Sequence, residues 1–219
     1  QNNGKFFCAS HSFLFLISRN IRKMDINCNY KETLRTFIAV KISENQNLKN
    51  AQHALKHKFQ EMPARWVTPA NYHITLRFLG NTHKRLLIPL AQSIKTVASS
   101  SQSFNLTLSG IGYFGKKDAP KVLWVGVEPN EQLNCLAKDL ECLARKFGFL
   151  PDLNPYHPHL TLARPKGNGF EKLMGEMEDD FQNMQFGSFN IPKIILYQSI
   201  MDSGGVLYNP LEDFALAST

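Results

Sequence analysis

One short pattern occurs twice in this chain of 219 residues, and it constrains the fold more than any other feature. The sequence HITL at 73–76 is matched by HLTL at 159–162, an offset of 86 residues. The same offset aligns two apolar, β-branched segments that are typical of strands. These segments are LRTFIAVKI at 34–42 and KVLWVGVE at 121–128. An offset shared by two separate features indicates that the chain contains a duplicated unit.

Both halves predict the element order β-α-β-α-β. In the first half, the apolar periodicity predicts strands at 34–42, 71–79 and 104–108 and helices at 43–61 and 84–98. In the second half, it predicts strands at 121–128, 157–164 and within 186–199, with helices at 130–147 and 170–182. A last hairpin is predicted near 206–216, with Tyr208-Asn209-Pro210 at its turn. We therefore expect two intertwined lobes, at about 34–110 and 120–200, and a closing hairpin at 205–217.

Composition places the chain among globular proteins. Apolar residues make up 43% and charged residues 20%, which excludes a wholly disordered chain and a coiled coil. The longest apolar run, at 13–17, is far shorter than the ~20 residues that a membrane-spanning helix needs. The formal charge of +7 favours an acidic partner such as nucleic acid, although the same charge also suits plain solubility.

The first 33 residues differ from the rest of the chain. Their apolar stretch is interrupted by polar residues at 10–12, and no small-residue cleavage site follows, as a secretory signal would require. We interpret residues 1–33 as an extension that is disordered or artefactual, with Met24 as the candidate start. A signal peptide is the weaker alternative. The folded domain is expected to cover residues 34–219.

Cysteine usage predicts a cytoplasmic protein. The four cysteines are Cys8, Cys28, Cys135 and Cys142. None forms a Cys-x-x-Cys pair or has zinc-finger spacing, so reduced thiols are the simplest interpretation. Cys135 and Cys142 are seven residues apart in a helical pattern and are expected to share one buried face.

The repeated motif predicts a stripe of polar side chains on each strand. Residues i and i+2 of a strand point to the same face, so His73 lies beside Thr75 and His159 beside Thr161. A pseudo-twofold axis between the halves would make the two stripes face each other across a cleft. One imidazole can then accept a proton from an attacking oxygen while the other gives a proton to the leaving oxygen of a phosphodiester. This chemistry requires no metal and no cofactor. The alternative is two buried histidines, each satisfied by a neighbouring hydroxyl.

Other residues near the motifs are weaker candidates. Arg164 could clamp a phosphate bidentately, but its odd spacing from the second motif histidine requires a bend in the strand. Phe37 is the aromatic residue that we expect to line the cleft, where a ring can stack on a base. Trp66 and Phe78 are expected to pack in the core, and His157 to point away from the site.

The sequence around both motifs is similar to that of a known superfamily. The similar segments include RTFIAV at 35–40, HITLRFLG at 73–80, VLWVGV at 122–127 and PHLTLAR at 158–164. In these segments the chain resembles the 2H phosphoesterase superfamily, and more closely its RNA 2′,3′-cyclic phosphodiesterases, formerly called 2′-5′ RNA ligases. The resemblance implies an α+β, bilobal fold of duplicated β-α-β-α-β units. Two mostly antiparallel sheets would face each other across a central cleft, with the helices outside.

The resemblance also implies roles for individual residues. His73 would be the proton donor and His159 the proton acceptor, with Thr75, Thr161 and Arg164 on the phosphate. The implied reaction opens an RNA 2′,3′-cyclic phosphate to a 2′-phosphomonoester without a cofactor. We expect a cytoplasmic monomer whose partner is RNA or a nucleotide, with no membrane or obligate protein partner. The alternatives are a 2′-5′ phosphodiesterase, a reversible 2′-5′ RNA ligase acting on tRNA halves, and a non-catalytic nucleotide- or RNA-binding module.

Overall fold

A computed structural model describes residues 32–59, 63–202 and 205–218. The first described strand, β1, begins at Thr33, one residue before the predicted start of the domain. Nearly all of the segment 1–33, including Met24, Cys8 and Cys28, lies outside the described residues. The interpretation of this segment as an extension therefore stays a prediction.

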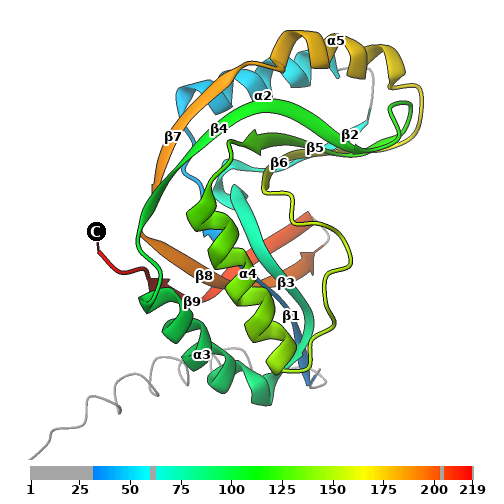
Figure 1. Ribbon diagram of the computed structural model, residues 1–219. Helices are drawn as coiled ribbons and strands as arrows, with labels where there is room; N and C mark the ends of the chain where they lie inside the picture. The colour runs from blue at the N-terminus through cyan, green and yellow to red at the C-terminus, as the bar shows by residue number, and fades with distance from the viewer. Residues whose placement is uncertain (1–31, 60–62, 203–204, 219) are drawn as a thin grey trace, which may run out of the picture.

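Strands and helices alternate along the chain much as the periodicity predicts (Figure 1). The first half contains β1 (Thr33–Lys41), α2 (Gln46–Lys58), β2 (Ala64–Trp66), β3 (His73–His83), α3 (Leu87–Ser99) and β4 (Phe104–Gly115). The second half contains β5 (Pro120–Val127), α4 (Glu131–Lys146), β6 (His159–Pro165), α5 (Glu171–Phe181) and β7 (Gln185–Ile191). The hairpin strands β8 (Lys193–Asp202) and β9 (Gly205–Ala215) follow.

The strands form a strongly curled antiparallel sheet in the order β7-β4-β5-β6-β3-β1-β8-β9, with β2 paired to β6. The order is symmetric about its centre. From one end the strands are β7, β4, β5 and β6, and from the other end their counterparts β9, β8, β1 and β3 follow in the same sequence. The predicted α+β class and the duplicated units are therefore confirmed. The two expected sheets are the two halves of one sheet, and a single residue pair, Ile74 with Leu160, joins them at the centre.

The helices cover the sheet in two pairs (Figure 1). Lobe I consists of β3, β1, β8 and β9 with α3 and α4, and lobe II consists of the remaining strands with α2 and α5. Helix α2 follows β1 but packs near β7, whereas α4 follows β5 but packs against β3. Each lobe therefore takes elements from both halves of the sequence, and one main apolar core runs through both lobes.

Local sequence signals explain the helix ends. The side chain of Asn45 accepts a hydrogen bond from the Leu48 amide and begins α2, two residues after the first position predicted. Asn130 caps α4 in the same way through the Leu133 amide. Gly148 adopts φ +82° directly after α4 and ends that helix, next to the predicted end at residue 147.

Three expectations about these elements are wrong. Cys135 and Cys142 do share a helix face, but that face is exposed because leucine and alanine side chains fill the buried stripe of α4. Strand β3 does not stop at Gly80. This residue adopts φ +74°, and the strand continues beyond it to His83. Tyr208 lies inside β9 rather than at a turn, because the hairpin pairs β8 with β9 from Asp202 and Gly205 onward.

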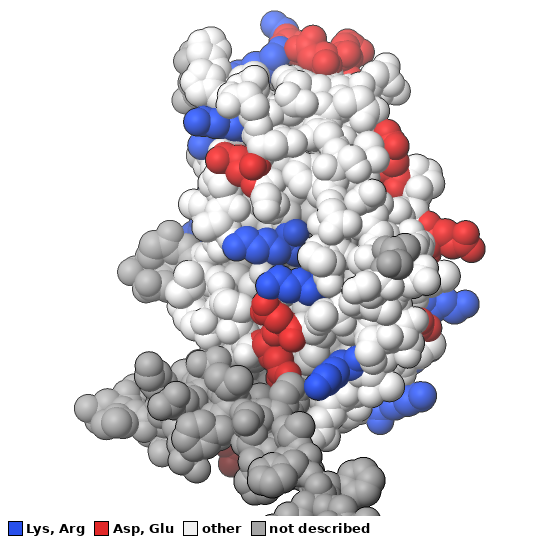
Figure 2. All heavy atoms as spheres, turned by 90° about the vertical axis from the view of Figure 1, so that its left-hand side faces the viewer, with Lys and Arg blue, Asp and Glu red and all other residues white. Residues whose placement is uncertain are grey.

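The positively charged side chains do not cover the surface evenly. Figure 2 shows one face of the molecule, on which acidic and basic side chains are interspersed. Several of the described lysines form ion pairs, for example Lys58 with Asp180 at 2.7 Å and Lys117 with Glu178 at 2.8 Å. Among the described residues, no helix is both long and apolar enough to cross a membrane.

Candidate active site

The two His-x-Thr motifs lie side by side at the centre of the sheet. Strands β3 and β6 meet at the pair Ile74–Leu160, which is the middle position of each motif. Ile74 and Leu160 are fully buried in the main core, so the flanking His and Thr side chains of 73–75 and 159–161 point to the opposite face. The first seven residues of β3 and β6 have the same pattern of buried and exposed positions. The four motif side chains therefore share one face of the sheet.

Both imidazole rings are fixed by the same hydrogen bond. His73 Nδ1 lies 2.7 Å from the carbonyl oxygen of Asn71, and His159 Nδ1 lies 2.7 Å from that of His157. A carbonyl oxygen only accepts, so Nδ1 carries the proton of each neutral ring. The Nε2 atom of each ring is then free to accept a proton, or to donate one when the ring is charged.

Aromatic rings pack against each histidine. His73 contacts Phe37 with ring centroids 5.1 Å apart and Tyr208 at 4.9 Å. Phe37 is only 3% exposed and belongs to a small apolar cluster under His73, so it presents little surface to a ligand. His159 meets the ring of Phe114 edge-on at 4.8 Å. These contacts restrict the rotation of both imidazoles.

The surroundings of both histidines favour the neutral ring. Burial lowers the pKa of His73 below its ordinary value of 6.5, and the charges of His159 and Arg164 act in the same direction. Burial likewise lowers the pKa of His159, assisted by the charges of His157 and Arg164. The hydrogen bond from each Nδ1 to its carbonyl opposes these effects only in part.

A bulge in β6 brings Arg164 to the same face. Thr161 pairs with Trp124 and Ala163 pairs with Leu123, so β6 has one more residue than β5 at this point. The extra residue, Leu162, reverses the alternation of the side chains. Arg164 is exposed on the side of the histidines, and its charge affects the pKa of both. The bulge supplies the bend that the odd spacing requires.

A cavity of about 530 Å³ opens beside the motifs. Its volume is within the range of small-molecule sites. It is bounded by both strands, by β4 and by the segment before β6, through Thr75, Phe78, Phe114, Tyr156, His157 and His159. The cavity reaches the motifs through Thr75 and His159, whereas His73, Thr161 and Arg164 share that face of the sheet without lining the cavity.

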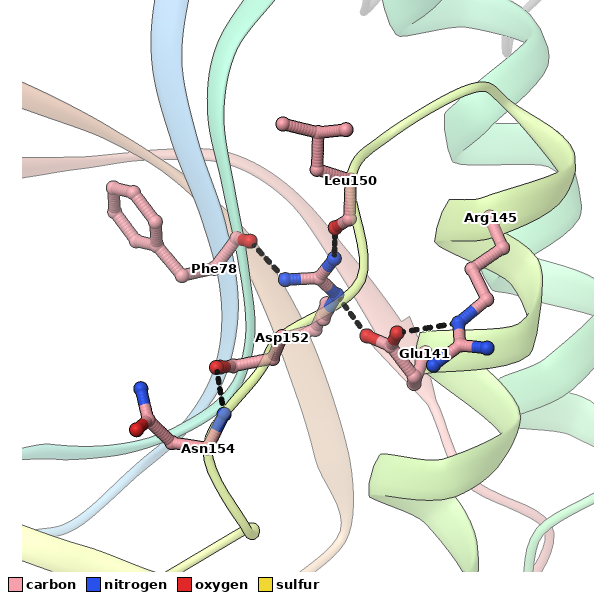
Figure 3. Close-up of polar contacts among 7 residues, drawn as sticks. Phe78, Glu141, Arg145, Leu150, Asp152 and Asn154 are labelled. Atoms are coloured by element: carbon pink, nitrogen blue, oxygen red, sulfur yellow. Dashed lines mark hydrogen bonds and ion pairs between the residues drawn. The ribbon is translucent and has the colours of Figure 1, made fainter.

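A buried arginine holds one wall of this cavity in place (Figure 3). Arg77 of β3 donates to the carbonyl oxygens of Phe78 and Leu150, and its guanidinium forms an ion pair with Glu141 of α4. The loop 149–158, which links α4 to β6, is tied to β3 a second time. Tyr156 Oη donates to the Thr75 carbonyl oxygen at 3.3 Å, and burial raises the pKa of this phenol and keeps it protonated.

The sequence reasoning missed several of these residues. Phe78 is 38% exposed rather than in the core, and the Arg35 guanidinium lies 4.5 Å from its ring centre. His157 lines the cavity beside His159, and residues two apart point to the same side of an extended chain, so the expectation that it points away is wrong. Trp66 packs against the main core as predicted. No sequence signal identified Arg77 or Tyr156, because their partners lie far along the chain.

Adjacent antiparallel strands, each with a His-x-Thr motif and an Nδ1-fixed imidazole, define the class of two-histidine phosphoesterases. A family model described as LigT like Phosphoesterase matches this chain twice, at residues 40–124 and 125–208, with one motif in each match. The chain belongs to the LigT-like phosphoesterase family.

Individual relatives agree with this assignment. A protein of Aquifex aeolicus named RNA 2′,3′-cyclic phosphodiesterase is 29% identical over 187 residues, which cover 84% of this chain and 98% of that protein. One of Aeropyrum pernix with the same name is 32% identical, over 72% of this chain and 89% of that protein. A similar relative from Geobacillus stearothermophilus is longer, and the matched residues span 43% of its length. The crystal structure of E. coli LigT with 3′-AMP superimposes with a TM-score of 0.64 at 26% identity, covering 84% of this chain and 99% of that one.

Proposed function

We propose that this protein hydrolyses RNA 2′,3′-cyclic phosphate ends to 2′-phosphomonoesters, without a metal ion, by acid–base catalysis with His73 and His159. The observation that carries this proposal is the placement of two equivalent imidazoles on one face, each with Nδ1 bound to a carbonyl, which leaves Nε2 as the atom that exchanges a proton. The name shared by the relatives from Aquifex aeolicus and Aeropyrum pernix supports the same substrate class.

In the proposed mechanism, neutral His159 accepts a proton from water through Nε2 as the water oxygen bonds to phosphorus. The bond between phosphorus and O3′ breaks, and protonated His73 donates its Nε2 proton to the departing O3′. The product carries the phosphate on O2′. Proton transfers of this kind typically contribute about 10²–10⁴-fold to the rate. No step passes through a metal or a cofactor.

The remaining polar groups stabilise the negative charge that develops on the phosphate. Thr75 and Thr161 share the face of the histidines and are proposed to donate their hydroxyl protons to the non-bridging oxygens. Arg164 is proposed to bind the same oxygens with its planar guanidinium. Its positive charge also lowers the pKa of both imidazoles, an effect that a bound anionic phosphate would offset.

The cavity suggests where the nucleoside lies. We assign the terminal base to the space between Phe78 and Phe114, whose rings line the cavity beside the motifs. Phe37, for which base stacking was expected, is proposed to support His73 from below instead, because its ring is buried against that imidazole. The proposed partner is therefore an RNA or nucleotide end. A cytoplasmic monomer remains our expectation for the protein itself.

The test is hydrolysis of an RNA oligomer with a 2′,3′-cyclic phosphate in the presence of EDTA. Wild type, His73→Ala and His159→Ala are compared, and the position of the product phosphate is determined. We expect EDTA-resistant turnover to a 2′-phosphate and a loss of about 10²–10⁴-fold in each variant. Turnover that EDTA abolishes, or a 3′-phosphate product, would contradict the mechanism. Binding of the oligomer without turnover would indicate a binding module, and joining of RNA ends in preference to hydrolysis would indicate a ligase.

A further inference from the structure

A second arginine lies directly opposite Arg164 on the neighbouring strand. The short strand β2 pairs antiparallel with β6 in a register that places Arg65 across from Arg164. Residues directly opposite each other in an antiparallel pair point to the same face, with Cβ atoms about 4.5–5.5 Å apart. Both arginine side chains are exposed. Two guanidinium groups therefore project side by side from one face of the sheet.

That face is the one that carries the histidines. The charge of Arg164 affects the pKa of His73 and of His159, so its guanidinium lies toward both imidazoles. On β2, the residues on either side of Arg65 are Ala64 and Trp66, which turn the other way and pack against the main core. Arg65 consequently extends the cationic surface outward from the reaction centre, beyond Arg164.

Two like charges directly opposite each other destabilise a sheet. Neither guanidinium forms a hydrogen bond or an ion pair with another side chain in the part of the chain that the structure describes. Elsewhere in this part, Arg77 and Arg145 both pair with Glu141, and Lys58 pairs with Asp180. Within the described residues these two arginines have no acidic partner, and an anion with more than one phosphate would relieve the repulsion between them.

We propose that Arg65 binds the phosphate on the 5′ side of the terminal nucleotide while Arg164 binds the cyclic phosphate that reacts. This inference rests on the proposed function and specifies its substrate class. A nucleoside 2′,3′-cyclic phosphate has only the reacting phosphate, whereas an RNA end also has the last internucleotide phosphodiester. Arg65 thus makes the site selective for oligonucleotide ends and for nucleotides with a 5′-phosphate.

The test uses the full chain and two substrates that differ in one group. The first is adenosine 2′,3′-cyclic phosphate, and the second is the same compound with a 5′-phosphate. We expect wild type to have the higher kcat/KM for the second. In Arg65→Ala, the ratio of the two kcat/KM values should fall about 10-fold, because one charge-assisted contact is lost. Arg65→Lys keeps the charge without the planar fork, so its ratio should lie in between.

Salt dependence gives a second readout. For a cyclic-phosphate-ended RNA oligomer, Arg65→Ala should lower the slope of log KM against log salt concentration by about 0.7, the value for one lost contact with a single strand. Lys49→Ala serves as the matched control. It also removes one exposed positive charge, but from helix α2, and should keep the wild-type ratio and slope.

Two results would overturn the inference about Arg65 while leaving the proposed function intact. One is a wild-type enzyme that hydrolyses both compounds with equal kcat/KM. The other is an Arg65→Ala variant in which both substrates slow equally, so that the ratio stays at its wild-type value. If wild type hydrolyses neither compound nor the RNA oligomer, the proposed function fails, and the role of Arg65 fails with it.

Discussion

Arg164 is the residue whose charge reaches both histidines. A bulge of one residue in β6 turns it toward the site, and its charge lowers the pKa of His73 and of His159. Both pKa values lie below 6.5, so the histidine that must be protonated loses its proton below that pH. The lowered pKa of the other histidine likewise keeps that ring neutral to a lower pH than a free imidazole. We therefore expect kcat/KM to be highest at a pH below 6.5 and to fall toward neutral pH.

Substitution of Arg164 tests whether its charge lowers the pKa of both histidines. Arg164→Gln removes the positive charge, so the pKa of both histidines should rise and the maximum of kcat/KM should move to higher pH. The maximum itself should be about 10–100-fold lower, because a charge-assisted contact with the phosphate is lost. The measurement is the pH profile of kcat/KM for a cyclic-phosphate-ended oligomer, with Lys49→Gln as the control. A maximum that stays in place or moves to lower pH would contradict the assigned position of Arg164.

Site residues could be predicted from the sequence where the whole motif lies on one strand. The spacing of His73 and Thr75 is a property of one strand, and its repetition at His159 made the pattern specific. Phe78 was misplaced because its exposure depends on a bulge, which side-chain alternation alone does not reveal. Tyr156 was missed because its partner, the Thr75 carbonyl, lies 81 residues away.

At the level of elements, the loop between α4 and β6 determines the shape of the cavity. It is irregular, yet the Leu150 carbonyl accepts a hydrogen bond from buried Arg77 (Figure 3). The Tyr156 hydroxyl donates a hydrogen bond to β3. The Arg77 side chain is 7% exposed and that of its partner Glu141 is 21% exposed. Removing Arg77 would leave Glu141 with only its exposed partner Arg145, and removing Glu141 would take the ion pair away from the buried Arg77 guanidinium.

Replacing Arg77 should separate stability from substrate binding. Arg77→Met should lower the free energy of unfolding by about 3 kcal/mol, because Glu141 loses its buried partner and keeps only exposed Arg145, and should raise KM because Leu150 is released. Arg77→Met combined with Glu141→Leu should regain most of the stability, since the charge that remains, Arg145, is exposed to water, while KM stays high. Urea unfolding and KM for the oligomer are the two measurements.

The control for this pair is Arg145→Ala, which removes the exposed partner of Glu141. It should change stability by less than about 1 kcal/mol and leave KM unchanged. If KM returned to the wild-type value together with stability in the double variant, Arg77 would act on overall stability alone and not through the loop.

Element types were predictable, and several element boundaries were not. The apolar periodicity predicted a helix at 130–147, within one residue of the observed ends of α4. Tyr208-Asn209-Pro210 has the composition of a turn, yet Pro210 lies in the edge strand β9, where a missing amide costs least. Cys135 and Cys142 had the correct helical spacing, but spacing alone does not say which face of a helix is buried.

On the scale of the whole molecule, the two lobes exchange helices. Helix α2 packs in lobe II although it follows β1 of lobe I, and α4 packs in lobe I although it follows β5 of lobe II. The repeated offset predicted the duplication correctly. The exchange was not predictable, because a repeat in the sequence gives no information on which copy a helix packs against.

Dividing the chain between β4 and β5 tests this exchange. Segments 32–117 and 118–218 each contain one His-x-Thr motif, but neither segment contains all the elements of one lobe. We expect neither segment alone to show a cooperative thermal transition by circular dichroism, because each lacks half of the shared core. Co-expression should give a complex that unfolds cooperatively and hydrolyses the oligomer. A segment that unfolds cooperatively by itself would contradict the shared core.

The central claim is that His73 acts as the acid and His159 as the base, and one substrate substitution tests it most directly. The substrate is a cyclic-phosphate-ended RNA in which sulfur replaces the bridging O3′, because a thiolate leaves without needing a proton. We predict that His73→Ala loses about 10²–10⁴-fold on the oxygen substrate but recovers nearly all of that loss on the sulfur substrate. His159→Ala should stay slow on both. Recovery in His159→Ala instead, or in neither variant, would contradict the assigned roles.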